Sequence, residues 1–194
     1  FVFFVSCSDD DDILPSISST FTNLHAPQTG GMGQPIGGDF TKFNFSTGQI
    51  TTDTQDWDIA FRGTTIIVNG GTKIGLNDEP NRNGTGAVGI ANGTFSSITS
   101  ADIGSLGQDG PNSPAIPNGS GNGWYNYSGP PTFLITPIPG KILIVKTHDD
   151  RYAKVEILSY YKDAPTNPNF MSSESRYYTF NYLYNPNEKD FNLN

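Results

Sequence analysis

The last third of the chain carries the clearest alternation of apolar and polar residues. Residues 142–145 are apolar throughout, which is typical of a strand buried on both faces. Residues 152–161 then alternate, with Val155 on an apolar face and Lys154 on a polar one. One face of the segment 176–184 is aromatic: Tyr178, Phe180, Tyr182 and Tyr184. These patterns predict an antiparallel three-stranded meander.

Shorter strand patterns come earlier in the chain. Residues 39–46 and 66–68 are rich in aromatic and β-branched side chains, and 57–62 alternates between an apolar face and a face that carries Asp58 and Arg62. They are followed by two Gly- and Asn-rich stretches, 72–93 and 98–123, which we expect to be long loops with one brief strand at 87–90. The chain is therefore predicted to be all-β, with packed antiparallel sheets and long Gly/Asn-rich loops.

Composition agrees with this fold and excludes several functions. The 194 residues include 22 Gly and 14 Pro, too many for a helical bundle. The net charge is -8 and no cluster of Lys or Arg is present, so nucleic-acid binding is not expected. One Cys cannot form an internal disulfide, and one Cys with two His cannot complete a Cys- and His-rich zinc site.

The N-terminus carries targeting signals. Residues 1–5 are apolar but too short to span a bilayer, and Cys7 lies between two serines, a pattern that resembles the lipobox of a bacterial lipoprotein. The aspartates at 9–12 resemble the export tract of Bacteroidetes lipoproteins. We expect residues 1–7 to be residual signal peptide and lipobox with Cys7 as lipid anchor, 8–22 an acidic polar linker, and 23–194 a single β domain. A short apolar N-terminus with a buried Cys and a solvated charge run is the alternative.

Catalysis is not indicated by the sequence. A hydrolytic triad needs a His near a carboxylate and a nucleophile. The two candidates are His25, in the linker-like N-terminal segment, and His148, in a predicted turn beside Asp149 and Asp150. We expect His148 to fill an exposed turn, no catalytic residue and no enzyme activity.

Several segments in the same order resemble the HmuY family of Bacteroidetes lipoproteins, and the likeness extends over about residues 35–186. The segments that carry it are 55–62 (QDWDIAFR), 66–71 (IIVNGG), 86–88 (GAV), 141–147 (KILIVKT), 152–157 (YAKVEI) and 178–182 (YTFNY). The resemblance implies an all-β lipoprotein of the outer membrane or cell surface. It further implies a role in iron acquisition, in which haem is bound and passed to a TonB-dependent outer-membrane receptor.

The ligand positions that the resemblance implies are vacant here. The best-known family member holds haem iron through two His, from loops on either side of the segment that reads 121–125 here, and related members use Met. Residues 98–120 contain no His, Met, Tyr or Cys, and 127–132 offers only Tyr127. In an uninterrupted meander, residues 163–173 return to the end of the sheet where the loop 128–131 lies, while His148 lies at the opposite end.

Substitute ligands follow from that topology. Met171 could supply a thioether to haem iron, with Lys162 and Arg176 near the propionates, and Met32 is a second candidate. Met171 could instead cover an apolar edge under a turn, and Met32 could lie in a mobile loop. A non-haem binding or scaffold lipoprotein of the same fold also stays open, with Trp124, Tyr125 and Tyr127 contacting a sugar, a peptide or a receptor.

Overall fold

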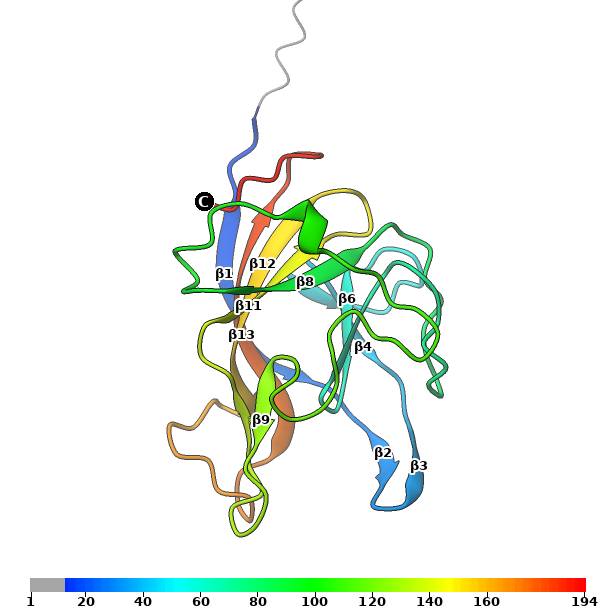
Figure 1. The fold of residues 1–194 in the computed structure, drawn as a ribbon, viewed down its shortest axis with the longest axis vertical. Helices are drawn as coiled ribbons and strands as arrows, with labels where there is room; N and C mark the ends of the chain where they lie inside the picture. Colours follow the sequence, from blue (N-terminus) through cyan, green and yellow to red (C-terminus); the bar gives the residue numbers. More distant parts are fainter. Residues whose placement is uncertain (1–12) are drawn as a thin grey trace, which may run out of the picture.

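Two antiparallel sheets form the framework of the protein in the computed structural model, which describes residues 13–194 (Figure 1). The five-stranded sheet has the order β1 (Ile17–His25), β13 (Ser175–Asn185), β12 (Tyr152–Tyr161), β11 (Lys141–Lys146) and β8 (Ala87–Asn92). The four-stranded sheet has the order β5 (Gln49–Thr51), β4 (Thr41–Asn44), β6 (Ile59–Arg62) and β7 (Thr65–Val68). The predicted all-β class is confirmed.

Two small hairpins and one helical turn complete the described elements. The hairpins pair β2 (Thr29–Gly31) with β3 (Gln34–Gly37) and β9 (Tyr125–Tyr127) with β10 (Ile135–Pro137), and η1 (Ile103–Ser105) is a single 3-10 turn. No helix within residues 13–194 has the length and apolar character needed to cross a membrane.

The C-terminal meander is present as predicted. β11 lies between β12 and β8, and all three pairings in the series β8, β11, β12, β13 are antiparallel. The aromatic face of β13 points between the two sheets, where Phe180 packs against Phe43 at 5.3 Å and against Phe61 at 5.9 Å between ring centroids. The alternation in the sequence therefore marks the face of β13 that forms the core.

Parts of the opposite faces of both sheets are also covered, which corrects an expectation. Asp58 and Arg62, on the polar face of 57–62, are buried, and so is Lys154. The Nζ atom of Lys154 donates to the carbonyls of Phe95 and Ile98, each at 2.8 Å, and its burial lowers the pKa of the ammonium group. Loop carbonyls thus pair with polar side chains of the sheets that the alternation alone assigns to solvent.

The N-terminal boundary also differs from the expectation. Residues 17–22, expected in the linker 8–22, belong to β1, whose first half pairs with β13 from Ile17↔Tyr184 to Phe21↔Phe180. Cys7 and the rest of 1–12 lie outside the described residues. The chain enters β1 at the upper end in Figure 1, opposite the β2–β3 hairpin.

Candidate functional site

Three segments project together from the lower end of the protein in Figure 1, and we call them the loop face. They are the β2–β3 hairpin (29–37), residues 127–134 around the tip of the β9–β10 hairpin, and residues 162–174 between β12 and β13. The second and third touch, because the rings of Phe133 and Phe170 are 5.2 Å apart in an edge-on arrangement. As the meander predicts, Met171 is on the same loop face as residues 128–131, and His148 is at the other end of β11 and β12.

Exposed apolar side chains gather on the loop face. It carries six of the thirteen exposed large hydrophobic residues found within 13–194: Met32, Ile36, Tyr127, Phe133, Phe170 and Met171. Met32 is fully exposed and Met171 is 82% exposed. Neither thioether covers an apolar edge, which corrects that alternative for Met171. Grouped apolar residues on a protein surface are typical of a binding site.

Met32 occupies the tip of a tight hairpin. Gly31 pairs with Gln34, so Met32 and Gly33 form a two-residue turn, with φ of 52° at Met32 and 90° at Gly33. Such turns favour Asn or Gly at the first position because other residues are strained at positive φ. Met32 is therefore held in a defined turn although its side chain contributes no packing, and a strained apolar residue of this kind points to a role outside the fold.

The basic candidates lie beside these segments. Lys162 pairs with Glu174, with Nζ 3.1 Å from Oε1, and this contact raises the pKa of the Lys162 ammonium. Arg176 donates from Nη1 to the carbonyl of Gln28 at 2.9 Å, which ties the start of β13 to the segment ahead of β2. Both cations lie near the loop face, and Lys162 is the more exposed of the two.

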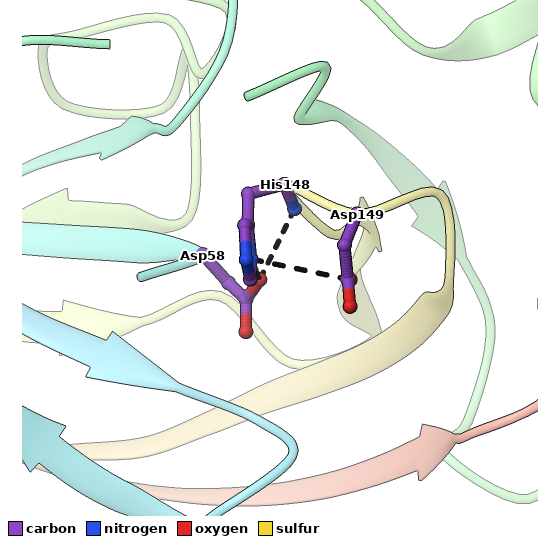
Figure 2. A group of neighbouring side chains, drawn as sticks. All are labelled: Asp58, His148 and Asp149. Carbon is purple, nitrogen blue, oxygen red and sulfur yellow. Dashed lines mark hydrogen bonds and ion pairs between the residues drawn. The ribbon is translucent and has the colours of Figure 1, made fainter. Parts of the chain in front are cut away.

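A second polar cluster lies at the opposite end of the sheets (Figure 2). The carboxylate of Asp58, which is 2% exposed, accepts from Nδ1 of His148 at 2.7 Å, from the backbone N–H of His148 at 3.1 Å and from the N–H of Phe45 at 2.7 Å. Asp56 and Asp149 flank the ring, with carboxylate oxygens 3.4 Å from Nε2 and 3.9 Å from Nδ1. The cluster joins the four-stranded sheet to the turn between β11 and β12.

This geometry makes His148 a structural residue. The prediction of an exposed turn is wrong, because the ring is half-buried and bonded to Asp58. Gly84 packs against His148, because a Cβ added at Gly84 would lie 2.5 Å from the Cβ of His148. Asp58, His148 and Asp149 are close enough to share a cation, but Asp58 already accepts three N–H bonds and Asp149 is paired with Arg151. His25 lies elsewhere, stacked on Tyr177 at the end of β1 with ring centroids 4.4 Å apart.

The His148 cluster predicts a pH dependence of stability. The hydrogen bond that His148 donates to Asp58 raises the pKa of the His148 imidazole above its ordinary 6.5, although partial burial opposes this. Protonation is favoured by folding, so the stabilisation is complete below about pH 6.5 and is lost as the pH rises through the folded-state pKa. Urea unfolding above pH 6 should show this decline, and the His148→Gln variant should show a flatter profile. An equal decline in the variant would contradict the assignment.

The family can now be identified by comparison. The family model described as HmuY protein matches residues 38–182, about three-quarters of the chain. The chain belongs to the HmuY family. No curated protein matches it.

Solved structures share the HmuY fold. The apo form of an HmuY analogue from Tannerella forsythia aligns with a TM-score of 0.57 at 16% identity, over 91% of this chain and 100% of the other. A Bacteroides vulgatus protein described as HmuY-like and haem-binding gives 0.50 at 18% identity over 89% and 93% of the two chains. A Bacteroides fragilis protein described as a lipoprotein gives 0.51 at 17% identity over 89% and 90%.

The two segments at which the resemblance places iron ligands lie in different parts of the protein. Residues 128–132 lie on the loop face, next to Phe170. The 98–120 segment is bound along the body of the protein, through bridges from Ser100 to Asn192 and from Gly107 to Val88. The first half of the 98–120 segment is therefore held against the sheets and does not reach the loop face.

The aromatic binding surface proposed for the alternative function is largely absent. Trp124 is 2% exposed and Tyr125 is 8% exposed, and both belong to the core between the sheets. The indole Nε1 of Trp124 donates to the carbonyl of Thr64 at 3.1 Å. Only Tyr127 of the three is exposed, so these aromatics fix the β9–β10 hairpin to the body.

Proposed function

We propose that this HmuY-family protein captures haem on its loop face, as an outer-membrane or cell-surface lipoprotein anchored through Cys7 that passes haem to a TonB-dependent receptor. Family membership and the haem-binding description of the Bacteroides vulgatus neighbour support the ligand. The observation that carries the proposal is the presence of six exposed apolar side chains on three segments that project from the same end of the protein. The proposed role is binding without chemical conversion.

The chemistry of the loop face suits a flat, mostly apolar ligand with two carboxylates. Phe133 and Phe170 offer ring surface to the macrocycle, and Met171 and Met32 offer thioethers to the iron. The Lys162 ammonium can exchange its exposed contact with Glu174 for a propionate, since both side chains are solvent-accessible.

The position of the loop face also supports the proposal. β1 is entered at the end opposite the loop face, so an anchor attached ahead of β1 leaves the loops directed away from the membrane. A receptor could then reach a bound haem without displacing the anchor.

Haemin titration tests the proposed iron ligands. Addition of haemin under reducing conditions should give a shifted Soret band, because thioether sulfur prefers ferrous iron. Met171→Ala should weaken binding about tenfold and alter the spectrum, through loss of both sulfur and apolar contact. Met32→Ala should have a smaller effect.

The isosteric Met171→Leu variant separates ligation from packing. It keeps the apolar volume but removes the sulfur, so it should retain most of the affinity and lose the ferrous low-spin spectrum. Identical spectra for the wild type, Met171→Leu and Met32→Leu would exclude both thioethers as ligands. The absence of any saturable Soret change would overturn haem capture itself.

A further inference from the structure

A cavity of about 680 Å³ opens on the four-stranded sheet, and none of its lining residues belongs to the loop face. Three segments distant in sequence line it: 39–42 around the start of β4, 50–54 at and after the edge strand β5, and 78–81 in the long loop that follows β7. Its volume lies in the range of ~300–1,000 Å³ that is usual for small-ligand sites.

The wall of the cavity is fixed by buried ionic contacts. The carboxylate of Glu79 accepts from the N–H groups of Ile74, Gly75 and Leu76 and pairs with Arg82 at 2.8 Å. Burial opposes ionisation of Glu79, but these donors outweigh it and hold the pKa of the carboxyl below its usual value. Nη1 of Arg62 donates to the carbonyls of Gly38 at 3.0 Å and Asn77 at 2.6 Å, joining this wall to the segment ahead of β4.

The nearby cations are already engaged. Arg82 pairs with Glu79 and Asp109, Arg62 bonds two carbonyls, and Nζ of Lys42 donates to the carbonyls of Thr52 and Asp53. The Lys42 ammonium also lines the cavity, but the carboxylates of Asp39 and Asp78 line it too and would repel a phosphate or a carboxylate ligand.

The remaining polar groups both donate and accept hydrogen bonds. Asp39 offers a carboxylate, Asn81 an amide with two N–H donors and one oxygen, and Thr52 and Thr54 offer hydroxyls. Phe40, Ile50 and Pro80 add apolar surface. An ammonium ligand would face the Lys42 ammonium that lines the same cavity and could only donate, whereas a sugar hydroxyl both donates to carboxylates and accepts from N–H groups.

We propose that this cavity binds a neutral polyhydroxylated ligand, a sugar unit of a glycan, at a site separate from the loop face. Asp39 and Asn81 bind vicinal hydroxyls, and the apolar residues contact the C–H face of the ring. The haem proposal and the sugar proposal rest on different residues, so each can fail alone.

NMR titration of the ¹⁵N-labelled protein tests the site. Glucose, galactose, mannose and N-acetylglucosamine are added separately at millimolar concentrations, with spermidine as the cationic comparison. At least one sugar should give saturable shifts of amide signals within 39–42, 50–54 and 78–81. Asn81→Ala and Asp39→Asn should each weaken that binding about tenfold, since each removes a direct hydrogen bond.

Asn118→Ala is the matched control, because Asn118 is equally exposed but lies on another loop. It should leave the sugar affinity unchanged, and well-dispersed spectra report that all variants are folded. Binding of none of the four sugars overturns the proposal. Saturable shifts only outside the cavity, or binding of spermidine alone, also overturn it.

Discussion

Replacing Asp58 with alanine is expected to lower the free energy of unfolding by about 3–5 kcal/mol. The change removes the acceptor of three hydrogen bonds, from the backbone N–H groups of Phe45 and His148 and from Nδ1 of His148. It also removes the contact between residue 58, directly ahead of β6, and the turn between β11 and β12. Urea unfolding followed by tryptophan fluorescence at pH 6 measures the loss.

His148→Gln provides the comparison for Asp58→Ala. It removes one side-chain donor and keeps the Asp58 bonds to the backbone N–H groups, so the expected loss is only about 1–2 kcal/mol. If the two variants were equally stable, the backbone contacts of Asp58 would contribute little and the cluster would act through the imidazole alone.

Arg82→Met is the second large effect, with an expected loss of about 3–5 kcal/mol. The side chains of Arg82, Glu79 and Asp109 are all 1% exposed, and Arg82 lies 2.8 Å and 3.1 Å from the two carboxylates. Met keeps the apolar volume of the side chain but leaves two buried carboxylates uncompensated. Urea unfolding at neutral pH measures the difference.

A variant that also lacks the two buried negative charges distinguishes the cost of uncompensated carboxylates from the cost of lost packing. Adding Glu79→Gln and Asp109→Asn to Arg82→Met removes the buried charges. Each amide keeps one acceptor oxygen but turns its NH2 group towards the backbone N–H groups that the other carboxylate oxygen served, so the recovery is partial. The triple variant should recover part of the stability lost in Arg82→Met. A triple variant less stable than Arg82→Met would show that the carboxylates stabilise the fold without the guanidinium.

The sheet framework was predictable because its strands are long enough to show a period. The apolar run at 142–145 and the aromatic face of 176–184 need only the two-residue repeat of a strand, and β11 and β13 occupy the expected places. The end of the sheet that carries Met171 was predictable too, since consecutive antiparallel strands alternate in direction.

The covered polar positions were not predictable from the same pattern. Alternation assigns Asp58, Arg62 and Lys154 to solvent, yet each is buried because loops with no period of their own return across the sheets. The partners of these side chains are largely backbone groups of residues 38, 45, 77, 95 and 98. A backbone carbonyl has no signature in the sequence, so such contacts appear only in three dimensions.

The candidate site was partly predictable for a similar reason. Met32 and Met171 stand out by their chemistry, and the structure exposes both. Trp124 and Tyr125 were misassigned because an aromatic residue in a Gly-rich segment suits a core anchor and a binding surface equally well. The cavity between β5 and the 78–81 segment could not be foreseen, because three unrelated stretches of chain create it.

The pairing of β1 with β13 has a mechanical consequence. The two strands run antiparallel along the long axis of the protein, so tension between the chain ahead of Ile17 and a partner holding the loops acts along the hydrogen-bonded ladder. Under such shear the hydrogen bonds between the two strands bear the force together and must break together. In a hairpin pulled apart from one end they break one at a time. The junction between β1 and β13 is therefore expected to resist a force applied between the start of β1 and the loop face.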